Sequence, residues 1–372
     1  MSMADITYTN ARLFDGAVLH PAGTVTFRGG RLADGESETV VDLGGDILSP
    51  GYVDLQVNGG GGVMFNAAPT VETLRLMATA HNGLGVTALL PTLITDTPEV
   101  TAAAIAAAVQ AVGEGVPGIA GLHLEGPHLS IARKGAHSPA LIRPMEVADL
   151  EALLAAAEVL PVLKITIAPE NVTTDQVRAL AEAGVLVAIG HSDADFATVL
   201  RYVDAGARCV THLFNAMSQL GNREPGIVGA ALDEGRLSAG LIADAIHVHP
   251  ASMRRAWAAK RGPGQIYLVS DAMSVAGTDQ PAFTLNGREI TRKDGRLTLA
   301  DGTLAGADLD LTRALNVLVG QCGIDLGAAL KAATTVPAEL IGLYADADPL
   351  AQANMIRISG DLTQVSPLQP FA

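Results

Sequence analysis

Residues 163–213 read LKITIAPENVTTDQVRALAEAGVLVAIGHSDADFATVLRYVDAGARCVTHL, and this stretch decides the fold class. Apolar runs of strand length alternate in it with segments of helical length: strands at 163–167, 184–189 and 208–213, helices at 174–183 and 196–205. Thr173 and Asp195 stand directly before the two helical segments, where their side chains can cap a helix N-terminus. Strands that alternate with helices in this way are typical of a parallel sheet covered by helices.

The same alternation extends in both directions along the chain. We expect eight strands, at 51–57, 86–90, 118–124, 163–167, 184–189, 208–213, 238–243 and 266–270. Further helices are expected at 71–80, 101–112, 147–158 and 250–259, the first of them capped by Thr70. Eight strands over about 220 residues fit a closed (β/α)8 barrel, a TIM-like α/β fold, better than an open doubly wound sheet.

The two ends of the chain have a different pattern. Residues 6–8 and 24–27 alternate as half-buried strands do, and we expect a strand at 355–358 to return to them. We therefore predict a small β-sandwich domain built from 1–48 and 345–372, beside a barrel domain at 49–344. Within the barrel domain, Asn286-Gly287 and Asp294-Gly295 favour tight turns and predict a β-hairpin insertion near 281–300. The helical pattern resumes at 311–319 and 326–333.

Composition limits the partners that the protein can have. The 372 residues are 49% hydrophobic and 17% charged, which excludes disorder as a description of the whole chain. With 24 basic and 39 acidic residues the net charge is −15, which argues against nucleic acids and anionic membranes as partners. The chain has 2 cysteines, no visible signal peptide and no apolar stretch of bilayer-spanning length, so we expect a cytoplasmic protein.

Four of the predicted strands lead into side chains that can bind a metal or carry a proton. These side chains are Glu125, His191, His212 and Asp271, after the third, fifth, sixth and eighth strands. Because the active site of a barrel lies at the carboxyl ends of its strands, we expect all four at one rim. Two imidazoles and a carboxylate commonly bind one catalytic Zn²⁺, and Fe²⁺, Co²⁺ and Mn²⁺ also accept them. Asp271 would then carry a proton for the attacking water.

Other candidates are weaker, because a single histidine near a strand end is more often a hydrogen-bonded structural residue than a ligand. His123 should share a strand face with Glu125, where packing and ligation are equally consistent with the sequence. Of His247 and His249, which follow the seventh strand by several residues, we expect the former to touch substrate. Asp54 lies inside the first strand and is expected to support the site or the core.

At these positions the chain resembles the amidohydrolase superfamily, and within it the deacetylases that act on N-acetylglucosamine 6-phosphate. The resemblance runs in order from about residue 40 to residue 340. The matching segments are SPGYVDLQVNG at 49–59, HLEGPH at 123–128, KGAH at 134–137, GHS at 190–192, THLFNAM at 211–217, REPG at 223–226, IAD at 242–244 with His247, Asp271-Ala272, and TLAG at 303–306. Each segment alone is weakly specific, whereas the ordered set is specific.

The resemblance implies hydrolysis of the acetamide of N-acetylglucosamine 6-phosphate to glucosamine 6-phosphate and acetate. It implies that Glu125, His191 and His212 bind one divalent ion per subunit, zinc first. Asp271 would move a proton from the attacking water to the leaving amine, and His137 would polarise the acetyl carbonyl. The substrate would be held by Ala136, Asn215, Ala216, Arg223, His247, Leu304, Ala305 and Gly306. Arg223 is expected to reach in from a neighbouring subunit, which implies a homodimer.

The chain departs from the superfamily pattern in two places. The His-x-His of the first strand is here Gln56-Val57-Asn58, and because neutral amides replace imidazole poorly, we expect one metal ion rather than two. Residues 344–353 depart from the usual pattern near the last strand, which leaves the course of the C-terminal β segment open.

Alternative functions remain open at this point. The substrate could be N-acetylgalactosamine 6-phosphate, or the reaction another amide or deaminase reaction of the superfamily. A different class is a catalytically dead sugar-phosphate-binding scaffold, against which the intact Glu, His, His and Asp set argues. A chain with a net charge of −15 also needs a local cationic pocket for a phosphorylated substrate, and Arg223, His247 and Lys134 are the candidates to supply it.

Overall fold

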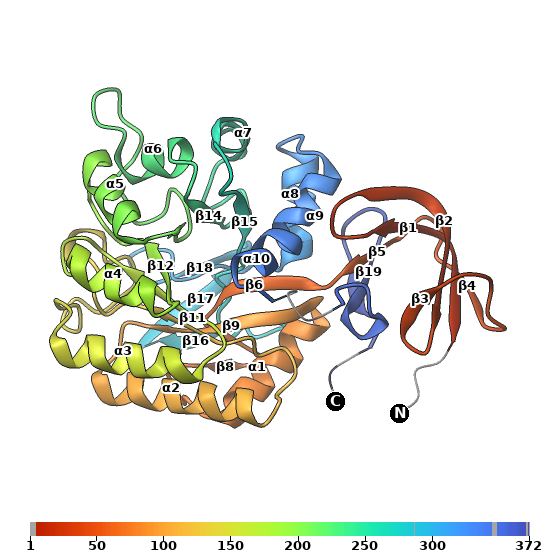
Figure 1. The fold of residues 1–372 in the computed structure, drawn as a ribbon, viewed down its shortest axis with the longest axis horizontal. Helices are drawn as coiled ribbons and strands as arrows, with labels where there is room; N and C mark the ends of the chain where they lie inside the picture. The colour runs from red at the N-terminus through yellow and green to blue at the C-terminus, as the bar shows by residue number, and fades with distance from the viewer. Residues whose placement is uncertain (1–4, 286, 344–347, 370, 372) are drawn as a thin grey trace.

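The computed structural model describes residues 5–285, 287–343, 348–369 and 371. Its largest unit is an eight-stranded parallel sheet, in which the strand order follows the chain order (Figure 1). The strands are β6 (Tyr52–Val57), β9 (Val86–Ile94), β10 (Leu122–Glu125), β11 (Leu163–Ile167), β12 (Leu186–Ile189), β13 (Cys209–Val210), β14 (Ser238–Leu241) and β15 (Ile266–Leu268). A bridge between Val57 and Ala272 joins the two edges just beyond β15, so the predicted (β/α)8 barrel is confirmed.

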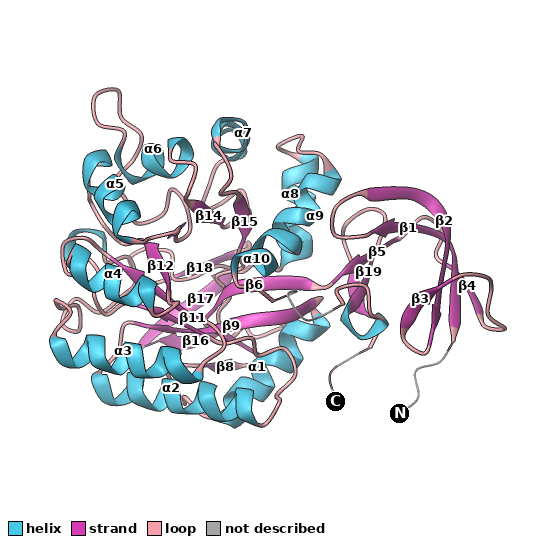
Figure 2. Ribbon diagram, in the orientation of Figure 1, coloured by secondary structure: helices cyan, strands magenta, loops and turns pink. Residues whose placement is uncertain are grey.

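Helices follow most of the barrel strands and cover the outside of the sheet (Figure 2). They are α1 (Val71–Gly83), α2 (Pro98–Gly113), α3 (Val147–Val159), α4 (Thr174–Glu182), α5 (Phe196–Ala205), α6 (Gly226–Asp233), α7 (Pro250–Ala259), α8 (Leu311–Gly320), α9 (Leu326–Ala333) and α10 (Thr335–Leu340). Thr70, Thr173 and Asp195 cap α1, α4 and α5 as predicted, each accepting a hydrogen bond from a backbone amide of the first turn.

Several predicted boundaries are wrong by up to four residues: the strand predicted at 118–124 begins at Leu122, and the strand predicted at 86–90 extends to Ile94. Two further differences have a local physical reason. Helix α2 begins at Pro98 rather than at residue 101, because the Thr97 side chain caps it and proline fits the first helical turn. The strand predicted at 208–213 ends at Val210, because the chain turns into a loop there and His212 takes a positive φ of 29°. Helix α6 was not among the predicted helices.

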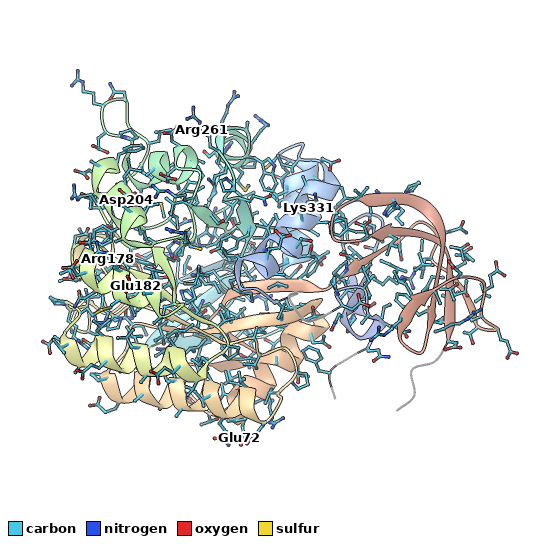
Figure 3. The ribbon with its side chains drawn as sticks, viewed as in Figure 1. Glu72, Arg178, Glu182, Asp204, Arg261 and Lys331 are labelled. Atoms are coloured by element: carbon cyan, nitrogen blue, oxygen red, sulfur yellow. The ribbon has the colours of Figure 1, made fainter. Side chains whose placement is uncertain are left out.

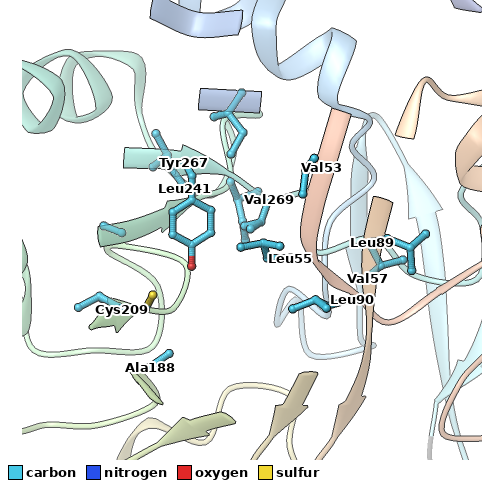
Figure 4. Close-up of a cluster of buried hydrophobic side chains, with 14 of the residues drawn as sticks. Val53, Leu55, Val57, Leu89, Leu90, Ala188, Cys209, Leu241, Tyr267 and Val269 are labelled. Atoms are coloured by element: carbon cyan, nitrogen blue, oxygen red, sulfur yellow. The ribbon is translucent and has the colours of Figure 1, made fainter. Parts of the chain in front are cut away.

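The barrel is filled by apolar side chains. Figure 4 shows Leu55, Leu241, Val269 and Tyr267 pointing into the space between the strands, and all four are fully buried. Lys164 of β11 is also buried in this interior, where its Nζ donates to the carbonyl oxygen of Leu55 at 3.2 Å. Because the interior is packed, chemistry is confined to the loops at the ends of the strands. Charged side chains such as Glu72, Arg178 and Asp204 lie instead on the exposed faces of the outer helices (Figure 3).

Strands from both ends of the chain form a second sheet, at the right of Figure 1. It contains β1 (Ile6–Phe14), β2 (Leu19–Arg28), β3 (Arg31–Ala33), β4 (Val40–Asp42), β5 (Ile47–Pro50), β19 (Met355–Ile358) and β20 (Val365–Pro367). Strand β19 pairs antiparallel with β5, so the expected return of the C-terminal strand is confirmed. The predicted sandwich is one continuous sheet of seven strands, because β1 pairs with β4 through Thr7–Thr9 and with β5 through Arg12 and Leu13.

The domain limits 1–48 with 345–372 and 49–344 remain a proposal. At the first limit, strand β5 pairs with β19 in the end sheet up to Pro50, two residues beyond the predicted boundary. At the second limit, residues 344–347 lie outside the described residues, and they are part of the segment 344–353 whose sequence departs from the family pattern.

An insertion follows the eighth barrel strand, as predicted. It is a three-stranded antiparallel sheet rather than a single hairpin: β16 (Ala282–Leu285), β17 (Arg288–Lys293) and β18 (Arg296–Thr298). Asp294 and Gly295 form the second turn with φ of 51° and 73°, the positive values that a tight hairpin turn needs. Asn286 in the first predicted turn lies outside the described residues.

The remaining short elements are β7 (Gly59–Gly60), β8 (Val63–Met64), η1 (Ile131–Arg133) and η2 (Gln352–Asn354). Among the described residues, the helices are too short or too polar to cross a bilayer.

Candidate metal centre and active site

Glu125, His191, His212 and Asp271 converge at the carboxyl ends of the barrel strands. The last three lie in the left-handed region, with φ of 47°, 29° and 50°. Non-glycine residues seldom adopt this conformation, and where it occurs it often marks a functional site, because the surrounding structure must compensate the strain. The turns that follow β12, β13 and β15 therefore aim these side chains inward over the end of the barrel.

Three of these side chains place ligand atoms around one point. His191 Nε2 lies 3.0 Å from His212 Nε2, and the two nitrogens lie 3.4 Å and 3.2 Å from Glu125 Oε1. Ligands about 2.0–2.1 Å from a tetrahedral zinc ion are separated by about 3.3–3.4 Å. The three atoms thus have nearly the spacing that a single tetrahedral ion requires. All three side chains are buried, and their ligand atoms lie within 4.8 Å of one another, close enough to hold one metal ion.

A hydrogen bond to the backbone orients the ring of His191. Its Nδ1 donates to the backbone carbonyl of Arg133 at 2.8 Å, which leaves the lone pair on Nε2, the atom that faces Glu125 and His212. A hydrogen bond of this kind to the far nitrogen is what fixes the tautomer of metal-binding histidines. His212 Nδ1 is buried and has no hydrogen-bond partner among the described residues.

The electrostatics of the cluster favour an ionised glutamate. Burial opposes the charge on Glu125, yet its close contacts with the imidazoles of His191 and His212 hold its pKa well below the ordinary value. Burial likewise opposes a charge on His212, but its contact with Glu125 raises the pKa of the imidazole. An anionic oxygen beside two imidazole nitrogens is a donor set that suits a divalent transition metal.

Asp271 lies beside this cluster and is held by two amides. Gln56 Nε2 donates both to Asp271 Oδ1 at 3.1 Å and to Glu125 Oε1 at 3.2 Å, and Asn58 Nδ2 donates to Asp271 Oδ1 at 2.7 Å. Burial, and then the charge of Glu125, raise the pKa of Asp271, which suits a group that accepts and returns a proton. The sequence singled out Gln56 and Asn58 as lost ligands, and their role as donors to the two carboxylates emerges only from the structure.

His137 faces the cluster from the loop that follows β10. Its ring meets the ring of His191 edge to face, with centroids 4.5 Å apart, and its Nε2 lies 4.0 Å from Glu125 Oε2. Burial, and then the neighbouring His191, lower the pKa of His137 to about 3, so the imidazole is neutral. Its Nδ1 contacts Thr95, a residue just beyond β9 that sequence reasoning missed, because a lone threonine after a strand carries no pattern.

A cavity of about 420 Å³ opens onto these groups. It is lined by the four converging side chains and by His137, the second residue predicted to be catalytic. Most of the predicted substrate residues also line it, namely Ala136, Asn215, Ala216, His247, Leu304 and Gly306. Apolar side chains also line it, among them Ile94, Met273 and Leu285 of the insertion. The mixture of an apolar wall and convergent polar groups is typical of a small-molecule site.

Two predicted substrate residues lie elsewhere. Ala305 is 1% exposed and packs into an apolar cluster with Leu285 and Leu297, so its side chain does not line the cavity. Arg223 is exposed on the loop before α6 and is not among the residues that line the cavity of its own chain.

His247 is fixed by Asp244 at the edge of the cavity. Its Nδ1 lies 2.6 Å from Asp244 Oδ2, while Asp244 Oδ1 accepts the backbone amides of Ile246 and His247 at 2.8 Å. The neighbouring His249 instead caps α7, with its ring accepting from the amide of Ala251.

Other sequence candidates occupy structural positions. His123 is buried between two hydroxyl groups, with Nδ1 3.1 Å from Thr92 Oγ1 and Nε2 2.8 Å from Thr166 Oγ1. Asp54 accepts the backbone amides of Gln56 and Ser270, and thereby ties the first barrel strand to the eighth.

A larger groove of about 680 Å³ lies between α2 and α3. It is mostly apolar, with several alanines from both helices, and it contains none of the predicted site residues. The titratable groups and the metal-ligand atoms converge in the smaller cavity, and we place the active site there.

Comparison with known proteins agrees with this geometry. Residues 47–351 match the amidohydrolase family. The chain belongs to the amidohydrolase family. Among characterised relatives, the N-acetylgalactosamine-6-phosphate deacetylase of Shewanella sp. (strain ANA-3) is 47% identical over 294 residues, 79% of this chain and 74% of the relative. The N-acetylglucosamine-6-phosphate deacetylase of Haemophilus influenzae is 36% identical over 307 residues, 82% of this chain and 79% of the relative.

Solved structures of this amidohydrolase group superpose closely. The N-acetylglucosamine-6-phosphate deacetylase of Pasteurella multocida gives a TM-score of 0.89 at 30% identity and covers 97% of both chains. A mutant of the Mycobacterium smegmatis deacetylase, in complex with N-acetyl-D-glucosamine-6-phosphate, gives 0.87 at 29% identity, over 98% of this chain and 97% of that one.

Proposed function

We propose that this amidohydrolase deacetylates an N-acetylhexosamine 6-phosphate, with N-acetyl-D-glucosamine 6-phosphate as substrate and D-glucosamine 6-phosphate and acetate as products. The observation that carries the proposal is the convergence of Glu125, His191 and His212 beside Asp271 in one cavity. The relatives named above act on 6-phosphates of N-acetylated amino sugars, which supports this substrate class and a place in amino-sugar catabolism.

Glu125, His191 and His212 would hold one divalent metal ion. When bound, such an ion supplies Lewis-acid stabilisation of developing negative charge and activates water at neutral pH. Two imidazoles and a carboxylate suit zinc first, and they also suit Fe²⁺, Co²⁺ and Mn²⁺. Elemental analysis of the purified protein would identify the metal.

Asp271 carries the proton in this proposal. As water adds to the acetamide carbon, one carboxylate oxygen of Asp271 takes a water proton. When the carbon–nitrogen bond breaks, Asp271 returns that proton to the leaving nitrogen, so the amine leaves neutral and acetic acid remains, which then ionises to acetate. The raised pKa of the buried carboxyl makes Asp271 a stronger base toward the water proton.

His137 stabilises the oxygen of the acetamide. Because the imidazole is neutral, its Nε2–H can donate a hydrogen bond to the carbonyl oxygen as negative charge develops on it. Ala136, Leu304 and Gly306 lie near this end of the cavity and would enclose the acetyl group.

The sugar and its phosphate would occupy the end of the cavity near Asn215, Ala216 and His247. Arg223 is suited to bind a phosphate through two parallel hydrogen bonds, but it is exposed in its own chain. We therefore propose a homodimer in which Arg223 completes the partner's site. Leu220 on the same loop is 60% exposed and Ile131 is 59% exposed, as expected of apolar side chains that a second subunit covers.

Galactosamine specificity is the second candidate. The Shewanella relative, at 47% identity, is an N-acetylgalactosamine-6-phosphate deacetylase, whereas the glucosamine enzyme of Haemophilus influenzae is 36% identical. The two sugars differ only in the orientation of one hydroxyl group, and the apolar wall around the acetyl group does not distinguish them.

We also place the enzyme in the cytoplasm, because Cys209 and Cys322 are both free and buried.

Acetate release from both sugar phosphates, before and after chelation and after metal is restored, tests the proposal. We expect activity that chelation removes and metal restores, and the ratio of the two kcat/KM values identifies the preferred sugar. A protein that retains no metal after reloading and releases no acetate would be a sugar-phosphate-binding scaffold instead. Hydrolysis of another cyclic amide or deamination at a higher kcat/KM would point to another reaction of the superfamily.

A further inference from the structure

Thr95 makes the closest contact to the far side of the His137 ring. Its Oγ1 lies 2.8 Å from His137 Nδ1, and its backbone amide donates to the same Nδ1 at 3.4 Å. Thr95 is 1% exposed, so water does not compete for these contacts. The Nδ1 edge of the imidazole is thus held by one residue, through its hydroxyl group and its backbone amide.

The two contacts determine which ring nitrogen carries the proton. A backbone amide can only donate, so its approach to His137 Nδ1 requires a lone pair on that atom. The Thr95 hydroxyl can donate to this lone pair at 2.8 Å, a shorter contact than the 3.4 Å to its other acceptor, the carbonyl oxygen of Glu125. A proton on Nδ1 would instead face the amide proton of Thr95. The neutral ring therefore carries its proton on Nε2, the nitrogen on the side of Glu125.

The position of Thr95 is set by the strands beneath the site. Ile94, the preceding residue, is opposite Glu125 in the parallel pairing of β9 and β10. Asn66 accepts the amide of Ile94 and donates to its carbonyl oxygen, at 3.1 Å and 3.0 Å. A Cβ on Gly126 would lie 2.2 Å from Thr95 Oγ1, so the glycine after Glu125 leaves the room that the hydroxyl occupies.

We infer that Thr95 is a positioning residue, which fixes the Nε2–H tautomer of His137 and so makes this histidine a hydrogen-bond donor toward the substrate. The inference rests on the proposed function for the role of His137 in turnover, but the tautomer itself does not depend on the identity of the substrate. With the opposite tautomer, Nε2 would present a lone pair to the carbonyl oxygen and repel it.

Nitrogen NMR of the zinc-loaded protein, labelled in its histidine rings, tests the inference directly. The His137 signals are assigned from their loss in His137→Gln. We expect the wild type to show protonated Nε2 and unprotonated Nδ1, and Thr95→Ser to keep this pattern. Thr95→Val removes the 2.8 Å hydroxyl contact and leaves only the longer 3.4 Å amide contact, so it should lose the pattern in part. Thr92→Val is the matched control, because it removes a hydroxyl from the same strand next to His123 Nδ1, and should leave the His137 signals unchanged.

Kinetics provide the second measurement. Thr95→Val should lower kcat about 10- to 100-fold, the range for groups that orient a functional side chain, with little change in KM or metal content, and Thr95→Ser should recover most of the rate. Protonated Nδ1 in the wild type, or a Thr95→Val protein with unchanged signals and rate, would overturn the inference. If the wild type releases no acetate, the NMR result still decides the tautomer, and only the proposed function fails.

Discussion

Asn58 Nδ2 donates a hydrogen bond to Asp271 Oδ1 at 2.7 Å, across the seam where the first and last strands close the barrel. Gln56 donates to the same oxygen and also to Glu125. Side chains at positions where the superfamily has metal-binding histidines therefore orient the two carboxylates instead. Asp271 and Glu125, the proposed proton carrier and the proposed metal ligand, are thus joined through one amide, which bears on how substitutions at the site should be interpreted.

Substitution of Asp271 by asparagine should separate proton transfer from structure. An amide oxygen can still accept from Asn58 and Gln56, so the fold and the metal content should be retained. The variant cannot take a proton from water, and kcat should fall about 10²- to 10⁴-fold. Elemental analysis and acetate release measure the two effects. Wild-type activity in Asp271→Asn would show that another group carries the proton.

The proposed metal-binding set can be tested with two buried residues that flank Leu124, namely Glu125 and His123. Glu125→Gln removes the anionic ligand and should weaken metal affinity by more than about 100-fold. His123→Asn, the matched control, removes a ring that lies between Thr92 and Thr166, and should keep the metal while lowering the free energy of unfolding by about 1–3 kcal/mol. Metal titration and urea denaturation report these quantities. Loss of metal from His123→Asn would place that histidine among the ligands.

Arg223→Ala should raise KM for the phosphorylated sugar far more than for unphosphorylated N-acetylglucosamine, because in the proposed dimer the guanidinium contacts only the phosphate. Arg261, exposed shortly before β15 and paired with Asp233, offers a matched surface control. A mixture of Arg223→Ala and Asp271→Asn subunits should regain activity, since a hybrid dimer contains one complete site. Equal effects on both sugars, or no regain in the mixture, would contradict the proposed role.

The buried carboxyl of Asp54 should make stability depend on pH. Burial raises its pKa to about 7, above the value of about 4 in an unfolded chain. The folded state then holds a proton that the unfolded state releases, so this contribution to stability is full below about pH 4 and is lost as the pH rises toward 7.

Asp54→Asn keeps an oxygen that can accept the amides of Gln56 and Ser270 but cannot ionise. Urea denaturation of the chelated protein should show that the wild type loses on the order of 2–4 kcal/mol more than this variant between about pH 4 and pH 7. Parallel pH profiles for the two proteins would mean that Asp54 is ionised throughout.

Much of the architecture was predictable because local patterns carry it. All eight barrel strands and the helices at 196–205, 250–259 and 326–333 follow from apolar runs and caps that act over a few residues. The strand ends where Glu125, His191, His212 and Asp271 stand were predictable for the same reason. Their assigned roles remain predictions that the experiments above test.

The sequence by itself determined which side chains reach the rim, since strand order and alternation place them there. Only the tertiary structure decided what each one touches. The pairing of Thr95 with His137 and of Asn58 with Asp271 joins residues 42 and 213 positions apart, and the exposure of Arg223 depends on how its loop leaves the barrel. Hydrogen-bond partners of this kind are set by strand register and turn geometry across the whole barrel, and no local pattern in the chain encodes them.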